Sequence, residues 1–373
     1  MEIGVGMLGY EFMGKAHAHA YRSVGPIASP PATPRLVALA GRDAERVWDA
    51  AHRYGFDRAV TDWRELLDNP DVELFDNCGP NHLHAEPTTA AARAGKHLLC
   101  EKPLGRDAAE SHAIWRAAEE AGVVHMCGFN YRFVPAIRLA RELIGAGDLG
   151  DIHRFSASYL QDWLADPDAP FAWRLDRAQA GSGALGDIGA HAIDLARFLV
   201  DEISTVAGRV RTVVAERPGG RVTVDDAFEA IVDFESGAGG SISASRLCHG
   251  RRNALAFEVS GSKGSLAFDL ERLNELSVYT GASAGGSRTR GFRRVLVTDP
   301  GHPFVEHWWP PGHTLGWADT FVHQADHLLR AIAGERAVAP HGATFEDGYR
   351  VAAVCDAIER SSEEGERTPV AYR

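Results

Sequence analysis

Four side chains in two distant segments have the types and spacing that acid–base chemistry requires. Lys102 directly follows a short apolar segment, 97–100. Asp187, His191 and Asp194 are spaced i, i+4 and i+7, which places all three on one face of a regular helix. A helical Asp-x3-His alone is more often a solvated or satisfied pair than a catalytic one. The lysine, expected at the carboxyl end of a strand, makes this polar face a candidate site for proton transfer.

A glycine-containing loop follows the first apolar segment and is a candidate phosphate-binding turn. A dinucleotide fingerprint has glycines at the first, third and sixth positions, but here the third position is acidic and repels a diphosphate. A P-loop is the alternative, and Ala16 excludes it because magnesium needs a hydroxyl there. The loop consists of Gly9, Tyr10, Glu11, Phe12, Met13 and Gly14.

The end of the second expected strand bears on the choice between two dinucleotides. Sites that prefer NAD have an acidic residue here for the ribose hydroxyls, whereas an arginine accommodates the 2′-phosphate of NADP. Gly41 occupies the acidic position and Arg42 follows it, which weakly favours NADP. The alternative that Arg42 and Asp43 only flank and cap the next helix stays open.

Seventeen histidines require that metal chemistry be considered. The pairs with ligand-like spacing are His82 with His84 and His323 with His327. Gln324 stands where the general-base glutamate of a zinc hydrolase belongs, which argues against that class. His17 and His19 fit packing or family-pattern roles better than ligand roles, so we expect no metal.

Short apolar segments alternate with helical stretches over the first 128 residues. This alternation indicates βαβ units and a parallel sheet. Ligands of such sheets bind at the carboxyl ends of the strands, which is where the glycine loop, Gly41 and Lys102 are expected. The expected strands are 3–8, 36–40, 72–78, 97–100 and 123–127, and the expected helices are 15–24, 44–54, 84–94 and 107–122.

Strand patterns dominate from residue 151 onward, and several alternate in polarity as half-exposed antiparallel strands do. Helices are expected over 187–200, 320–333 and 346–360, and a Gly/Ser/Arg-rich connection over 281–291. The expected strands are 152–160, 206–214, 224–234, 240–247, 255–260, 265–270 and 276–279.

These patterns predict an α/β fold with two domains. The first, residues 1–128, is a Rossmann dinucleotide-binding domain. The second, residues 129–373, is an α+β domain with a large, open-faced, mostly antiparallel sheet, and its late helix can pack back on the first domain.

Composition excludes several classes of protein. The formal net charge of -12 at pH 7 argues against nucleic acid as a partner. No apolar segment approaches the roughly 18 residues of a membrane span, and the amino terminus has no basic leader. The five cysteines are scattered without CxxC spacing, which argues against a disulfide framework. We therefore expect a cytoplasmic protein.

The chain carries a set of motifs that occur together in one family. They are the Gly9 loop, Pro80-Asn81-His82-Leu83-His84, Glu101-Lys102-Pro103 and Gly186-Asp187-x3-His191-x2-Asp194. Over nearly its whole length the chain resembles the glucose-fructose oxidoreductase, inositol dehydrogenase and rhizopine-catabolism (Gfo/Idh/MocA) family. Segments 159–163, 173–174, 180–187 and 346–349 resemble the levoglucosan dehydrogenase-like sugar dehydrogenases within it. Glu11 departs from the family pattern.

The resemblance implies an NAD(P)-dependent oxidoreductase that acts on a ring hydroxyl of a sugar, sugar derivative or cyclitol. His191 then takes the hydroxyl proton as the hydride leaves, Lys102 stabilises the developing alkoxide, and Asp187 orients the pair and balances its charge. Besides the residues of the Gly9 loop, the implied cofactor residues are Gly41, Arg42, Asn81, His84, Glu101, Lys102, Trp173 and Arg174. Candidates for the sugar, since hydroxyls need polar partners and ring faces stack on aromatics, are Tyr131, Gln161, Asp194, Trp308 and Trp309.

Two other functions stay open at this point. An enzyme that reduces its bound cofactor only transiently could oxidise a glycoside and promote elimination or epimerisation. A noncatalytic sensor or scaffold would result if Glu11 abolished dinucleotide binding. The resemblance also implies a homodimer or homotetramer associating through the open sheet face.

Overall fold

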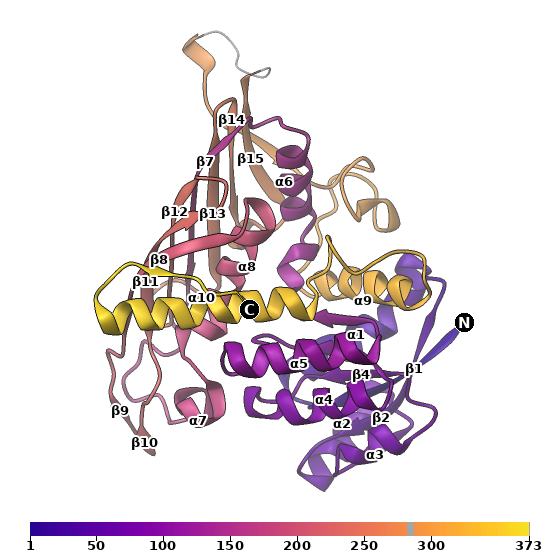
Figure 1. The fold of residues 1–373 in the computed structure, drawn as a ribbon. Coiled ribbons are helices and arrows are strands. Elements are labelled where there is room, and N and C mark those ends of the chain that lie inside the picture. The colour runs from indigo at the N-terminus through magenta and orange to yellow at the C-terminus, as the bar shows by residue number, and fades with distance from the viewer. Residues whose placement is uncertain (282–286, 373) are drawn as a thin grey trace. The chain divides into compact units, whose positions relative to one another are not determined.

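The computed structural model describes residues 1–281 and 287–372, whose contacts group them into two compact units (Figure 1). The first contains Met1–Phe133 and Gly316–Ala352, and the second contains Val134–Leu315 and the described residues from Ala353 onward. The segment 316–352 thus groups with the amino-terminal unit. The predicted connection 281–291 lies partly outside the described residues.

The first unit is built on a parallel sheet of strand order β3-β2-β1-β4-β5-β6. This is the order of a doubly wound dinucleotide-binding sheet, so the predicted Rossmann-type sheet is confirmed. The strands are β1 (Glu2–Leu8), β2 (Thr33–Ala40), β3 (Arg58–Val60), β4 (Leu74–Asn77), β5 (His97–Cys100) and β6 (His125–Cys127).

The strands of this sheet end in register at one edge. Leu8 pairs with Ala40 and with Asn77, and Asn77 pairs with Cys100. The strand order reverses between β1 and β4, where ligands of doubly wound sheets bind. The loops that leave from this edge begin at Gly9, Gly41, Cys78 and Glu101.

Capping residues fix where the helices of the first unit begin. Asp43 accepts the Arg46 N–H to cap α2, and Asp107 accepts the Glu110 N–H to cap α5. Late in the chain, α9 packs against α1 and Arg330 donates to the Ala28 carbonyl. The helices are α1 (Phe12–Ala28), α2 (Ala44–Tyr54), α3 (Arg64–Asp68), α4 (Ala85–Arg93), α5 (Ala108–Ala121) and α9 (Asp319–Ile332), with 3₁₀ turns η1 (Asn81–Leu83) and η2 (Asn130–Phe133).

The second unit is built on a sheet whose described strands run in the order β16-β15-β14-β13-β7-β12-β11-β8-β17. Neighbours pair antiparallel except β7 with β12, so the predicted mostly antiparallel sheet is confirmed. Its strands are β7 (Ile152–Leu160), β8 (Ile203–Arg211), β11 (Ala227–Phe234), β12 (Gly239–Ser245), β13 (Ala254–Gly261), β14 (Gly264–Asp269), β15 (Glu275–Thr280), β16 (Arg293–Leu296) and β17 (Thr368–Pro369); β9 (Glu216–Arg217) and β10 (Gly220–Arg221) form a separate hairpin.

Helices α6 (Pro135–Gly145) and α8 (Ala190–Leu199) pack against strands of this sheet. Side chains alternate along β11, where Phe228, Ala230 and Val232 are buried while Glu229 and Ile231 are exposed. Ile231 is 62% exposed, which marks the open face. The remaining helical segments are α7 (Arg177–Ala180), α10 (Phe345–Glu364), η3 (Trp173–Leu175), η4 (Leu185–Gly189), η5 (Leu270–Arg272), η7 (Ser287–Thr289) and η8 (Val305–His307). Every described helix is too short or too polar to cross a membrane.

Candidate active site

Lys102 lies in the loop after β5 and is half-buried. The fully buried His84 braces this loop, because its Nδ1 lies 2.7 Å from the Pro103 carbonyl oxygen and its Nε2 lies 2.9 Å from that of Gly79. Burial lowers the pKa of the His84 imidazole, although the hydrogen bonds to these two carbonyl oxygens raise it. His84 therefore joins the backbone of the loop after β4 to that of the loop after β5, and Asn81 begins the 3₁₀ turn η1 in the first of these loops.

The glycine loop has the conformation of a phosphate-binding turn. Gly9 has φ +100°, and a Cβ atom there would lie 2.6 Å from the Cys78 carbonyl oxygen, so no other residue fits well. The helix that follows, α1, starts at Phe12 and directs its first N–H groups toward the same edge. The residues of this loop thus fit a dinucleotide diphosphate.

Glu11, which departs from the fingerprint, is paired with a cation. Its carboxylate lies 2.5 Å from Nη2 of Arg46 on α2, and its side chain is 69% exposed. The guanidinium of Arg46 also lies 5.6 Å from the centre of the Tyr10 ring. Much of the expected repulsion of a diphosphate is therefore offset by Arg46.

The ring of Tyr10 limits which residue types fit at the end of β2. A side chain at Gly41 would overlap the Tyr10 ring, so a carboxylate at that position has no room. Asp43 accepts the Arg46 N–H as the cap of α2, and Arg42 is exposed. The position where NAD-preferring sites have an acidic residue is thus a glycine covered by an aromatic ring.

In the second unit, the segment around Asp187 differs from the predicted regular helix. Residues Leu185–Gly189 form a π-helical turn, and the α-helix α8 begins only at Ala190. Asp187 lies in this wider turn, so the predicted helix over 187–200 is a π-turn that continues into an α-helix, not one regular α-helix. His191 and Asp194 are three residues apart on α8, share a face and are buried. Single π-turns of this kind occur frequently at functional sites.

A buried network that the sequence analysis missed holds this turn. The two carboxylate oxygens of Asp225 accept the N–H groups of Gly183 at 2.6 Å and Leu185 at 2.8 Å. The fully buried Arg246 donates from Nη2 to the Asp225 carbonyl oxygen at 2.8 Å, and its Nη1 lies 3.7 Å from an oxygen of Asp187. Burial raises the pKa of the Asp225 carboxyl although Arg246 and the two N–H groups lower it. The signal in the sequence was a single arginine directly after a strand of small residues, 239–245.

Polar groups also converge near the ring of His191. The Tyr159 ring lies 6.0 Å from that of His191, and its hydroxyl donates to Asn253 Oδ1 at 2.7 Å. Gln161 donates to the same oxygen at 2.8 Å. The structure thus brings Gln161 into the neighbourhood of His191, together with Tyr159 and Asn253, which were not among the predicted site residues.

The remaining candidates occupy other places in the two units. The guanidinium of Arg174 stacks 4.3 Å from the centre of the Trp173 ring. Trp308 and Trp309 contact each other edge to face, with ring centres 6.1 Å apart. Tyr131 is buried in η2 of the first unit.

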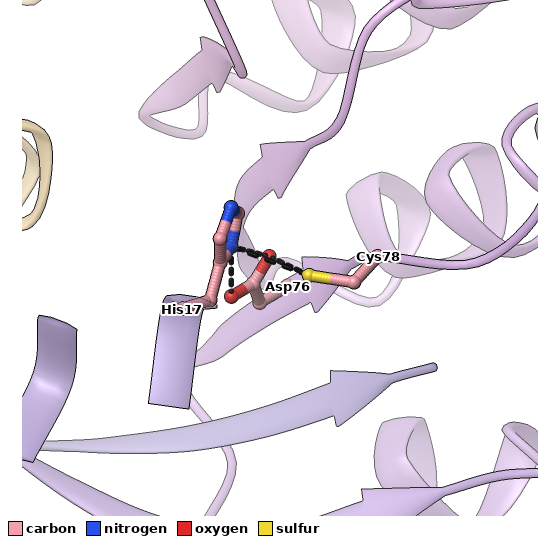
Figure 2. Close-up of side chains that lie close together, drawn as sticks. All are labelled: His17, Asp76 and Cys78. Atoms are coloured by element: carbon pink, nitrogen blue, oxygen red, sulfur yellow. Dashed lines mark hydrogen bonds and ion pairs between the residues drawn. The ribbon is translucent and has the colours of Figure 1, made fainter. Parts of the chain in front are cut away.

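Among the described residues, one set of three side chains has potential metal-ligand atoms close together, namely His17, Asp76 and Cys78 (Figure 2). This cluster was not predicted. The histidines of the HExxH-like segment have other contacts, because His323 Nδ1 lies 2.9 Å from the Phe133 carbonyl oxygen and His327 Nε2 lies 2.8 Å from that of Val338.

Comparison with known proteins agrees with this geometry. Residues 3–129 match the sequence model of an oxidoreductase family with an NAD-binding Rossmann fold, and residues 137–267 match the GFO/IDH/MocA C-terminal domain. The chain is 43% identical to levoglucosan dehydrogenase of Pseudarthrobacter phenanthrenivorans over 96% of both proteins. The chain belongs to the Gfo/Idh/MocA family of oxidoreductases. The resemblance found in its motifs is confirmed.

Other members of the Gfo/Idh/MocA family show how far the likeness extends. Inositol 2-dehydrogenase of Rhizobium meliloti is 28% identical over the full length of both proteins. A solved structure of levoglucosan dehydrogenase in complex with NADH and levoglucosan matches with a TM-score of 0.96, 43% identity and complete coverage of both chains. An oxidoreductase domain protein from Kribbella flavida matches with the same TM-score and 48% identity.

Proposed function

We propose that this Gfo/Idh/MocA oxidoreductase is an NAD(P)-dependent dehydrogenase that oxidises a ring hydroxyl of a sugar, sugar derivative or cyclitol. The observation that carries the proposal is the full-length similarity to levoglucosan dehydrogenase, whose solved complex contains NADH and a sugar. The second unit also has a buried histidine beside an amide and a phenol group, which suits a polyhydroxylated ligand. Levoglucosan is therefore the first substrate to test.

His191 is the proposed general base. An imidazole accepts a proton near neutral pH, and its burial on α8 keeps that proton from exchanging freely with solvent. Asp187 orients the imidazole and balances its charge once it is protonated, and Gln161 and Asp194 hold sugar hydroxyls. Lys102 supplies the cation that stabilises the alkoxide.

The proposed cofactor-binding residues lie at the edge of the first sheet that the carboxyl ends of its strands form. Bound NAD(P)⁺ supplies the hydride acceptor. The Gly9 loop and the amino terminus of α1 hold the diphosphate, and Tyr10 with Arg42 lines the end of β2. Glu101, His84 and Asn81 support the nicotinamide half. NADP use is proposed from Arg42 and from the lack of room for a carboxylate at Gly41.

The test is a panel of levoglucosan, simple pyranoses and inositols assayed with NAD⁺ and NADP⁺, following cofactor reduction and product together. We expect turnover with a ring alcohol and a loss of about 10²- to 10⁴-fold in kcat in His191→Asn. His249→Asn, at an exposed position of the same unit, is the matched control and keeps its rate. Product formation without net cofactor reduction would instead favour the elimination or epimerisation mechanism.

NADH titration by fluorescence separates the enzyme from a sensor. The pairing of Glu11 with Arg46 supports cofactor binding, and we expect saturation well below millimolar concentration. Absence of binding at millimolar NADH and NADPH would contradict the dehydrogenase.

We also propose a cytoplasmic homodimer or homotetramer. The five cysteines, which all lie among the described residues, form no disulfide, which fits a reducing compartment. The exposed Ile231 on the open sheet face supports association there. Light scattering measures the molar mass of the unmodified protein and of Ile231→Lys. A monomer mass for the unmodified protein would contradict this proposal.

A further inference from the structure

Phe12, the first residue of α1, has an exposed aromatic ring beside the glycine loop. Phe12 is 65% exposed, and one face of its ring stacks on Trp317, with ring centres 5.3 Å apart and planes 11° apart. Trp317 lies just before α9, which packs against α1 (Figure 1). The stack covers one face of the Phe12 ring and leaves the rest of the side chain open to a ligand.

Trp317 joins Phe12 to a row of rings that leads into the first unit. The ring of Trp317 meets that of Phe321 at 64°, with centres 4.7 Å apart, and the Phe321 ring lies 5.4 Å from that of His17. Trp317 is half-buried, whereas Phe321 and His17 are both only 2% exposed. This aromatic row therefore begins at the exposed ring of the glycine loop and ends at a buried imidazole.

The contacts of His17 fix where the aromatic row ends. Its Nδ1 lies 2.9 Å from Asp76 and 3.2 Å from the sulfur of Cys78, as Figure 2 shows, and its Nε2 lies 3.1 Å from Oε1 of Glu101. Asp76 and Cys78 lie at the end of β4, and Glu101 directly follows β5. The row thus extends from the phosphate-binding turn to the strand ends at which we place the nicotinamide half of the cofactor.

Two buried side chains hold the backbone of Trp317. The hydroxyl of Thr320 donates to the Trp317 carbonyl oxygen at 2.7 Å, and Nδ2 of Asn130 donates to that hydroxyl at 2.9 Å. Thr320 is 1% exposed and Asn130 is 4% exposed. Trp317 is therefore held in place before any ligand binds, which reduces the entropy that binding would cost.

The exposed face of Phe12 suits an apolar part of the dinucleotide. The diphosphate is polar and fits the N–H groups of the turn, so a heterocycle with its ribose is the part that gains from covering an aromatic ring. The adenosine half belongs to the end of β2, where Tyr10 lies over Gly41. The aromatic row leads instead to the ends of β4 and β5, which assigns Phe12 to the nicotinamide half.

We propose that Phe12 and Trp317 form an aromatic wall of the cofactor site, in which Trp317 holds the Phe12 ring against the nicotinamide half of the dinucleotide. Trp317 acts through Phe12 and is thus a positioning residue. The inference rests on the dinucleotide site of the proposed function and does not depend on which sugar is oxidised.

The aromatic wall is tested by calorimetric titration with NADH and with ADP-ribose, which lacks the nicotinamide. We expect Trp317→Leu to raise the dissociation constant of NADH about threefold to tenfold, the effect of one aromatic pair, and that of ADP-ribose less than about twofold. Trp317→Phe keeps a ring and should keep most of the affinity for NADH. Unchanged NADH binding by Trp317→Leu, or an equal loss with both ligands, would overturn the proposal.

The matched control is Trp48→Leu. Trp48 is 63% exposed on α2 of the same unit and stacks on His52, with ring centres 5.9 Å apart and planes 8° apart. It is thus a stacked tryptophan that does not contact the glycine loop, and we expect its loss to leave both dissociation constants unchanged. A loss of NADH affinity as large as that of Trp317→Leu would overturn the proposal.

A double-mutant cycle tests whether the two rings act together. We expect Phe12→Leu to weaken NADH binding as much as Trp317→Leu does, and the double variant to bind no worse than either single variant, because both changes remove the same contact. Losses that multiply in the double variant would show two independent effects and overturn the proposal. Phe12 is exposed, so Phe12→Leu keeps the fold and carries the test even where Trp317→Leu lowers stability.

These titrations separate the inference from the proposed function because they measure binding and not turnover. If NADH binds equally well to the unmodified protein and to both single variants, the inference alone fails. If the variants show the expected difference between NADH and ADP-ribose but the unmodified protein oxidises no ring alcohol, the proposed function alone fails.

Discussion

Arg246 Nη1 lies 3.7 Å from a carboxylate oxygen of Asp187, while Nη2 of the same guanidinium donates to the Asp225 carbonyl oxygen. Arg246 is fully buried, and Asp225 caps the turn that carries Asp187. One arginine thus links the strand end after β12 to the π-turn before α8. The positive charge of Arg246 therefore stays beside Asp187 whether or not the imidazole of His191 is protonated.

The first prediction concerns this arginine. Arg246→Met should lower the free energy of unfolding by on the order of 3 kcal/mol, since it leaves the buried Asp225 carboxylate without its counter-charge. It should also lower kcat about tenfold, because Asp187 loses its fixed position. Arg246→Lys keeps the charge but not the planar fork, and should recover part of the rate. Urea unfolding and sugar oxidation measure both effects, and a Met variant as active as the parent would contradict the role.

The sequence predicted most elements of the fold because their patterns are local. Strand β1 is an uninterrupted buried stretch after its first residue, and the cap of α2 is visible as Asp43. The π-turn at Asp187 depends instead on Asp225, about 40 residues further on, which binds its first N–H groups. The spacing of Asp187 and His191 in the sequence does not reveal this contact with Asp225.

The second prediction concerns the ion pair of the glycine loop. Arg46→Ala frees the Glu11 carboxylate, which then opposes the cofactor diphosphate, so the dissociation constant of NADH should rise about threefold to tenfold. The double variant Glu11→Gln with Arg46→Ala should bind close to the parent. Glu11→Gln alone should change little, since the exposed pair contributes only about 0.2–1 kcal/mol. Fluorescence titration measures all four proteins, and tight binding by Arg46→Ala would show that Glu11 points away from the diphosphate.

The third prediction concerns the choice of dinucleotide. Arg42 follows a glycine that Tyr10 covers, so we expect its guanidinium to pair with a 2′-phosphate. Arg42→Ala should lower kcat/KM for NADP⁺ about tenfold and leave that for NAD⁺ nearly constant. Arg58→Ala, an exposed arginine on β3, serves as the control. An equal loss with both cofactors would show that Arg42 does not recognise the 2′-phosphate and only flanks α2.

The candidate site was harder to predict than the fold. Lys102 and His191 stand out by residue type next to strand and helix patterns, whereas the sequence around His17 gave no sign of its buried contacts. Its partners Asp76 and Glu101 are 59 and 84 residues away, and only the parallel register of β1, β4 and β5 brings their strand ends together. Arg246 was missed for the same reason, because its partners come from separate loops.

The fourth prediction concerns the pH dependence of stability through His125. Its Nδ1 accepts the Phe345 N–H at 3.1 Å and its Nε2 donates to Glu119 at 3.0 Å, which is the pattern of a neutral ring. Burial lowers the pKa of His125 below its ordinary value although Glu119 raises it. The unfolded chain, with a pKa near about 6.5, binds this proton first, so the stabilisation is complete above that pH and is lost as the pH falls toward the folded pKa.

His125→Gln should therefore flatten the fall of the unfolding free energy between pH 7 and 5, by at most about 1.4 kcal/mol per pH unit for one proton. The substitution should not abolish this pH dependence, because burial also lowers the pKa values of His84 and His97. Urea unfolding at several pH values measures the slope, with the exposed His52→Gln as control. The His17 contribution has the opposite sign, since a raised pKa gives stability below about 6.5 that is lost as the pH rises. A steeper acid slope in His125→Gln would mean that the native ring carries the proton and that Phe345 does not donate to it.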